Sequence, residues 1–329
     1  MTADRISRRR FTRLICSTAA GWPFAAQAQQ SRNLQVGFLY PGPQSGVASR
    51  MGAVVAGMRA GGLSEPERMM VPRAADGNIA LLAPMAADLV ARKLDLIIAV
   101  SPAAVRALRA ATTTIPILAG DLESDPVGSG YVASITRPGG NITGVFLDFP
   151  EFGAKWLEVL KEAAPQISSV AIFWDPGTGR AQLAAVESAA AKLHLKLLIS
   201  EVRGRSDVEL AFQSAVRQGA GGLLMLSSPF IGGNTKLLAD LAMKHRLPSV
   251  TLFTDFARDG GLMAYGPNLL AFFRQEGVMA AKLLQGAKPA ETPVETPAKF
   301  EFVLNLKTAN LLGLNVPPSI LLRADEVIE

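Results

Sequence analysis

The sequence predicts an α/β protein made of two open units of similar size. Three observations lead to this fold class. Short apolar runs alternate with amphipathic stretches along most of the chain, which is typical of parallel strands covered by helices. A turn cluster at residues 138–141 interrupts the alternation, which then starts again. Each half is too short to close the eightfold barrel that is the main structural alternative.

The first half contains three apolar runs with the length of a strand. We expect strands at residues 34–40, 94–100 and 115–119. The run at 94–100 is continuously apolar, which indicates a buried central strand. Helices are expected at about 51–62, at 79–93 and from residue 102 onward. Ser101 and Pro102 have the residue types of an N-cap and of a first helical position.

The second half repeats the pattern and ends in an irregular tail. Strands are expected at residues 169–174, 196–201, 222–226 and 249–252. Helices are expected at 152–164, from about 177 to 193, at 207–218 and at 234–245. The tail adds a helix at about 269–285, a proline-rich loop, a strand at 300–304 and a short helix that ends at Gly313.

The N-terminus has the features of an export signal. Arg8, Arg9 and Phe11 match the twin-arginine pattern, and a modest apolar stretch follows at residues 14–26. That stretch is too short to span a bilayer, which takes about 20 apolar residues. It ends in the small-x-small cleavage motif at 26–28. We therefore expect residues 1–28 to be a signal peptide and the mature protein to be periplasmic.

Composition excludes several function classes once the signal is set aside. The whole chain carries 33 basic and 28 acidic residues, of which residues 1–28 hold five arginines and one aspartate, leaving 28 and 27. A nearly neutral chain has no concentrated basic face for nucleic acid or an anionic membrane. Cys16 is the only cysteine. The mature chain therefore lacks disulfides, a thiol nucleophile and cysteine-ligated metal.

Motifs of catalysis and of cofactor binding are missing from the sequence. It has no Gly-x-Ser-x-Gly elbow, no phosphate loop and no Gly-x-Gly-x-x-Gly after the first strand. His194 and His245 have no histidine or cysteine partner at metal-ligand spacing. We therefore expect no catalytic residue, no metal and no cofactor, and a protein that is not an enzyme.

The C-terminal third carries a long family resemblance. The stretches concerned are residues 260–267, 286–289, 293–309, 312–319 and 323–329, with shorter matches at 101–104, 125–127 and 137–144. They resemble the periplasmic substrate-binding components of ABC transporters, in the tryptophan/tyrosine-binding-like group. The resemblance covers the chain from about residue 34 to its end. The loop at residues 41–45 departs from the group, which often has a His-Pro or similar polar pair there.

This resemblance implies a fold and a division of the chain. The fold is the type I periplasmic-binding fold, with two Rossmann-like lobes, three crossovers and a ligand cleft between the lobes. We assign residues 29–144 and about 268–304 to lobe one. Residues 145–267 and about 305–329 form lobe two.

Ligands of open α/β sheets bind beyond the carboxyl ends of the strands, so the loops there supply the candidate site. Helix starts near Ser45 and Ser101 suit a carboxylate. The acidic cluster of Asp121, Glu123 and Asp125 after a strand end suits an ammonium group. Tyr265, beside three glycines, is expected at a crossover between lobes. For each of these residues an ordinary cap, turn or packing role stays open. The expected ligand-binding residues are Tyr40, Ser45, Ser101, Ala103, Asp121, Asp125, Asn141, Thr143, Trp174, Asp175, Ser227, Phe230, Thr254 and Tyr265.

Taken together, these features indicate an extracytoplasmic solute-binding protein. We expect it to act as a monomer that delivers a small organic solute to an ABC permease at the inner membrane. The aromatic candidates Tyr40, Trp174 and Phe230 favour an aromatic or branched amino acid. A ligand-sensing protein that serves a receptor, and an exported α/β enzyme, are the alternatives.

Overall fold

The computed structural model describes residues 34–147 and 149–329, without the side chains of residues 149–151. The expected signal peptide at residues 1–28, with Cys16, lies outside the described residues. Within the described part the strands form two sheets, one of five and one of seven strands. We call them the first sheet and the second sheet.

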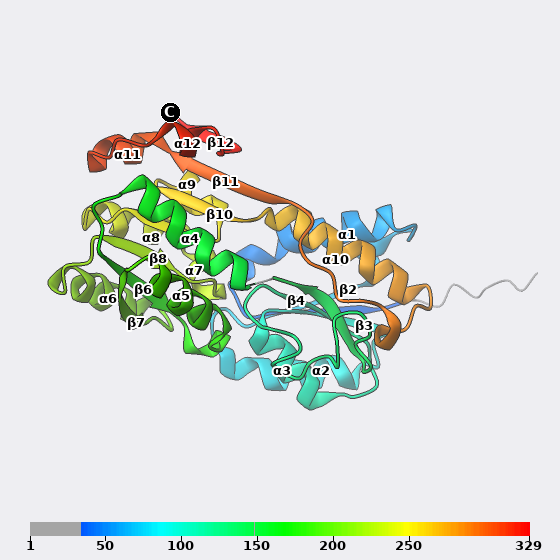
Figure 1. The fold of residues 1–329 in the computed structure, drawn as a ribbon. Coiled ribbons are helices and arrows are strands. Elements are labelled where there is room, and N and C mark those ends of the chain that lie inside the picture. Colours follow the sequence, from blue (N-terminus) through cyan, green and yellow to red (C-terminus); the bar gives the residue numbers. More distant parts are fainter. Residues whose placement is uncertain (1–33, 148) are drawn as a thin grey trace, which may run out of the picture. The chain divides into compact units, whose positions relative to one another are not determined.

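The first sheet is entirely parallel, in the order β2-β1-β3-β4-β5. Its strands are β1 (Val36–Tyr40), β2 (Met70–Ala74), β3 (Leu96–Val100), β4 (Ile117–Asp121) and β5 (Ile142–Phe146). Two helix pairs cover it, α2 (Leu82–Ala91) with α3 (Pro102–Ala111) and α1 (Val47–Ala60) with α10 (Leu269–Leu284). The two pairs lie on opposite faces (Figure 1). Strands β1, β3 and β4 are therefore buried on both sides, as their sequences, apolar apart from Asp121 at the end of β4, lead one to expect.

The second sheet has the order β12-β11-β10-β9-β8-β6-β7. Its strands are β6 (Ser169–Trp174), β7 (Lys196–Glu201), β8 (Gly222–Met225), β9 (Ser249–Thr251), β10 (Met263–Pro267), β11 (Phe300–Asn305) and β12 (Glu326–Ile328). Strand β11 is antiparallel to β10, and the other neighbours are parallel. The sheet is thus a doubly wound one whose last two strands at one edge, β11 and β12, run opposite to the others.

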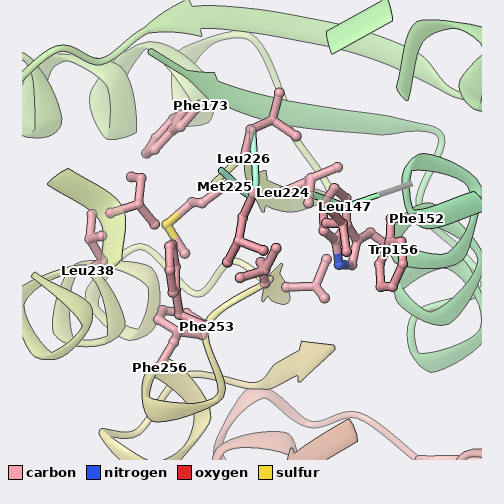
Figure 2. Close-up of a cluster of buried hydrophobic side chains, with 14 of the residues drawn as sticks. Leu147, Phe152, Trp156, Phe173, Leu224, Met225, Leu226, Leu238, Phe253 and Phe256 are labelled. Atoms are coloured by element: carbon pink, nitrogen blue, oxygen red, sulfur yellow. The ribbon is translucent and has the colours of Figure 1, made fainter. Parts of the chain in front are cut away.

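The described chain has eight further α-helices, six between β5 and α10 and two after α10. They are α4 (Phe149–Ala163), α5 (Ala181–Lys192), α6 (Arg205–Arg217), α7 (Pro229–Gly233), α8 (Thr235–Lys244), α9 (Thr254–Arg258), α11 (Leu306–Leu312) and α12 (Pro318–Leu321). Figure 2 shows the core that they enclose, where Leu224 and Met225 of β8 lie among aromatic side chains. Trp156 of α4 is the largest of the fully buried ones, and its indole Nε1 donates to the Tyr265 carbonyl at 2.7 Å.

Helices α1 and α10 touch through their backbones. A Cβ built on Gly57 of α1 would lie 2.0 Å from the carbonyl oxygen of Arg274, and one on Gly277 of α10 would lie 2.0 Å from that of Val54. Only glycine fits at both positions. The contact joins α10, which comes late in the chain, to α1, the first α-helix described (Figure 1).

The structure confirms most of the expected elements. Strands β6 and β7 have the predicted bounds, and the other predicted strands differ by one or two residues, most of them at one end only. Four strands were not predicted: β2, a half-buried edge strand that contains a proline; β5, which directly follows the turn cluster; β10, which carries Tyr265; and β12, a three-residue edge strand. Residue 265 was expected at a crossover loop, but its strand is paired on both sides in the second sheet.

The strand at residues 300–304 belongs to another sheet than expected. We placed it in lobe one, but β11 pairs with β10 and β12 of the second sheet. Helix α10, just before it, packs on α1 and on β4 and β5 of the first sheet. The change of sheet therefore falls between α10 and β11. The exact lobe boundaries stay a prediction.

Candidate functional site

A cavity of about 440 Å³ lies where loops after β1 and β3 meet loops after β6, β7 and β8. We call it the strand-end cavity. Five of the predicted residues line it: Ser45, Ser101, Ala103, Asp175 and Phe230. The cavity thus has the place that open α/β sheets give to ligands, beyond the carboxyl ends of the strands.

A much smaller hollow, of about 40 Å³, shares Ser101 and Pro229 with the strand-end cavity. We call it the inner hollow. Its wall is largely aromatic and includes Tyr40, Phe253, Phe272 and Phe273, with Arg50 and Glu123 as the charged groups. The Arg50 guanidinium lies over the Tyr40 ring, 4.9 Å from its centroid, and donates to the Gly46 carbonyl at 2.9 Å. Burial raises the pKa of Tyr40, so its hydroxyl stays neutral.

Ser101 lies between the two spaces in an unusual conformation. Its φ of 83° is in the left-handed region, which costs a serine backbone strain. Its N–H donates to the Gly120 carbonyl at 2.9 Å, and its hydroxyl has no partner although the residue is buried. Ser101 was expected to cap α3, but its side chain makes no capping bond. The hydroxyl and the first N–H groups of α3 are therefore available to a ligand.

Asp121 and Glu123 form an acid pair at the carboxyl end of β4. Oδ1 of Asp121 accepts the N–H groups of Glu123 at 2.8 Å and Ser124 at 2.9 Å, whereas its Oδ2 has no partner. The two carboxyl groups lie close enough to influence each other's ionisation. Burial is the largest cause that raises the pKa of each, and their mutual repulsion adds to it for Glu123.

The acid pair also connects the loops of the two sheets. The Ser227 hydroxyl, after β8, donates to Oε1 of Glu123 at 2.7 Å. The side-chain amide of buried Gln182, on α5, holds Ser227 in place with two bonds of 2.8 Å. It accepts the Ser227 N–H and donates to the Ser227 carbonyl. Arg106 of α3 donates to the Gly177 carbonyl at 2.6 Å, which is a second link of the same kind. These bonds hold the strand ends of the two sheets against each other around the cavity.

Six predicted site residues lie elsewhere. Asn141 and Thr143 are at the amino end of β5, where Asn141 donates to the Ile115 carbonyl at 2.8 Å and Thr143 to that of Thr292 at 2.8 Å. The Trp174 indole donates to the Gly179 carbonyl, and Thr254 accepts from Arg258. None of these four side chains, nor that of Tyr265, lines the strand-end cavity or the inner hollow. Asn141 and Thr143 were misplaced because β5 was not recognised as a strand.

Asp125, the sixth, borders a larger hollow of about 770 Å³. This hollow is lined mostly by alanines of α5 and by residues next to the end of β5, such as Phe146 and Leu147. Among its described lining side chains none is a buried polar group without a partner. Size alone favours this hollow, but the chemistry favours the strand-end cavity, because unsatisfied buried polar atoms are expected where a ligand completes the site.

Glu123 belongs to the acidic cluster that was expected to suit an ammonium group, but its burial was not visible in the sequence. Three other residues that shape the site were not predicted. Arg50, Arg106 and Gln182 lie inside helices, where nothing in the sequence separates them from surface residues. Only the packing of those helices against the strand ends reveals them.

The described residues show neither a helix long and apolar enough to cross a membrane nor a cluster of three metal-ligating side chains. Comparison with known proteins adds the family. A model of the family described as ABC transporter substrate binding protein matches residues 44–328. A tyrosine-binding protein of Clostridioides difficile (strain R20291) is 25% identical over 232 residues, which are 70% of this chain and 66% of that protein. The match thus spans slightly less than two thirds of this relative.

Solved structures share the fold. An ABC domain from Streptococcus pneumonia in complex with L-Trp has 22% identity and a TM-score of 0.82, covering 90% of this chain and 100% of that one. The ligand-free, open structure of a substrate-binding protein with adhesive properties from Clostridium difficile also has 22% identity, over 90% and 99% of the two chains, but a TM-score of 0.64. The architecture is that of type I periplasmic-binding proteins. The chain belongs to the family of ABC transporter substrate-binding proteins.

Proposed function

We propose that this protein is an extracytoplasmic receptor that binds a small organic solute with an ammonium group and delivers it to an ABC importer. On this proposal it catalyses no reaction. Family membership supports the transport role. The export pattern at residues 1–28 supports a periplasmic location reached by the twin-arginine route.

One observation supports a positive charge on the solute. Beside the inner hollow, Asp121 has a buried carboxylate oxygen without a partner, and the neighbouring Glu123 lines that hollow. A buried carboxylate is stable only when it is paired or hydrogen-bonded, and an ammonium group supplies both interactions. The free Ser101 hydroxyl and the start of α3 suit a carboxylate on the same solute.

The strand-end cavity, of about 440 Å³, has room for an amino acid. The aromatic side chains around the inner hollow favour an aromatic one, and that hollow, of about 40 Å³, would have to widen to admit the ring. The tyrosine-binding relative and the L-Trp complex agree with this solute class. We therefore propose L-tyrosine and L-tryptophan as the first solutes to test.

The experiment is a thermal-shift screen of the purified mature protein. L-Tryptophan and L-tyrosine are compared with indole-3-propionate and 3-(4-hydroxyphenyl)propionate, which keep the ring and the carboxylate but lack the ammonium group. A ligand at a hundredfold excess over its Kd stabilises the folded protein by about 2.7 kcal/mol. We expect a shift with the amino acids only.

Two variants test whether the solute binds at the acid pair. Glu123→Gln should lose most of the shift, because the amide cannot pair with a cation. Asp240→Asn is the matched control, since Asp240 is an exposed acid paired with Lys236 on α8. Equal shifts from the propionates, or a full shift in Glu123→Gln, would contradict an ammonium site at the acid pair.

A further inference from the structure

The acid pair is buried without a cation in contact. Asp121 is 0% exposed and Glu123 is 5% exposed. Neither takes part in any of the ion pairs between described residues. Their direct donors are two backbone N–H groups and the Ser227 hydroxyl, which are neutral. Two negative charges here would therefore have no compensating charge at hydrogen-bond distance.

In the wider surroundings Arg106 compensates only in part, because its positive charge lowers the pKa of Asp121 without a direct bond to it. The titratable and charged groups that face the pair come from several elements: Tyr40 of β1, Arg50 of α1, Arg106 of α3, Tyr131 after β4, Asp175 after β6 and Glu276 of α10. Arg50 and Arg106 each direct a guanidinium N–H to a backbone carbonyl. Asp175 adds negative charge near Glu123. Glu276, against Gly120, is fully buried, and this burial raises its pKa and keeps it neutral.

Two neighbouring buried carboxyl groups cannot both ionise easily, and these two are held together by the Glu123 N–H that Asp121 Oδ1 accepts. One proton held between them would remove most of the repulsion and would give the unpartnered Oδ2 of Asp121 a role in a hydrogen bond. An ammonium group would do the same, because it carries the same charge as the proton that it replaces.

We propose that the ligand-free protein holds one proton between Asp121 and Glu123, and that the ammonium group of the solute displaces this proton when it binds. The inference rests on the proposed function and adds to it a rule for how pH controls affinity. One proton leaves the carboxyl pair for the solvent, the ammonium keeps its three hydrogens, and no covalent bond of the solute changes. The site carries one negative net charge before and after the exchange.

The exchange links affinity to pH. Where the free pair is protonated and the complex is not, the Kd falls about tenfold for each unit of pH increase. Burial raises the pKa of Asp121 to about 6 and that of Glu123 to about 8, so this dependence belongs to the interval between those values. Solutes are captured more tightly at neutral pH and released more easily in acid.

The first test needs no solute. The side-chain carboxyl carbons of aspartate and glutamate are labelled with ¹³C, and NMR follows them against pH in the wild type and in Glu123→Gln. We expect a wild-type carboxyl that titrates between about pH 6 and pH 8 and is missing from the variant. Ionisation of every carboxyl except Glu276 below about pH 5, near the ordinary values, would overturn the shared proton.

The second test counts the proton. Binding of L-tryptophan and of L-tyrosine at neutral pH is measured by calorimetry in buffers of different ionisation enthalpy. Release of close to one proton per bound solute is expected, also in the Asp240→Asn control. Binding without release overturns the exchange while leaving the receptor function intact. If neither amino acid binds, the proposed solute class fails, and the NMR titration alone decides whether the proton is shared.

Discussion

The contact between α1 and α10 gives a sharp stability prediction through Gly57. Its Cβ in Gly57→Ala would lie 2.0 Å from the carbonyl oxygen of Arg274 and 2.9 Å from the Cα of Gly277, whereas ordinary contacts begin at 3.4 Å. Both obstacles are backbone atoms of the neighbouring helix, so no side-chain rotation relieves them. The two helices must separate. Overpacking of this kind costs about 1–3 kcal/mol and occasionally more.

Gly52 provides the matched control on the same helix. A Cβ at Gly52 meets nothing within 4 Å, so Gly52→Ala should stabilise the helix by about 0.5–1 kcal/mol. Both variants gain the same helix propensity, and their difference in unfolding free energy therefore isolates the crowding. For a chain of this size we expect Gly57→Ala to melt at least 2–4 °C below Gly52→Ala, at about 2–4 °C per kcal/mol.

Thermal and chemical denaturation of the two variants measures this difference. Equal stability of Gly57→Ala and Gly52→Ala would refute the close approach of the helices. A more stable Gly57→Ala would do so even more clearly.

Three further predictions concern buried polar groups. Trp156→Phe keeps an aromatic ring but removes the pyrrole ring of the buried indole and its bond to the Tyr265 carbonyl, so chemical denaturation should show a loss of at least about 1–3 kcal/mol. Ser227→Ala should lower stability by a similar amount, because Glu123 loses its donor; unchanged stability would show that this bond contributes nothing. The raised pKa values of Asp121 and Glu123 stabilise the ligand-free fold in acid, and this contribution, on the order of a few kcal/mol, is fully present below about pH 4 and is lost progressively between about pH 4 and pH 8. Thermal melts of Glu123→Gln should show a smaller loss over that interval.

Site residues were predictable where they come after the carboxyl end of a strand that can be recognised from its apolar run. Ser45, Ser101, Ala103 and Asp175 follow strands that are evident from their apolar runs, and all four line the strand-end cavity. Sequence reasoning failed where a strand was invisible. Thr143 lies inside β5, a five-residue strand that begins next to a turn cluster and that no apolar run announces.

Local pattern was enough to establish the parallel strands, the helices between them and the restart in mid-chain, because periodicity and apolar runs are properties of neighbouring residues. It also suggested the family, through a long C-terminal motif. Pairing between distant segments was beyond its reach. The placement of β11 in the second sheet, the contact of Gly57 with α10, and the bond from Ser227 to Glu123 join residues far apart in the chain. Burial of the acid pair, and hence its charge, arises only from that long-range packing, since a carboxyl group titrates according to what surrounds it in space.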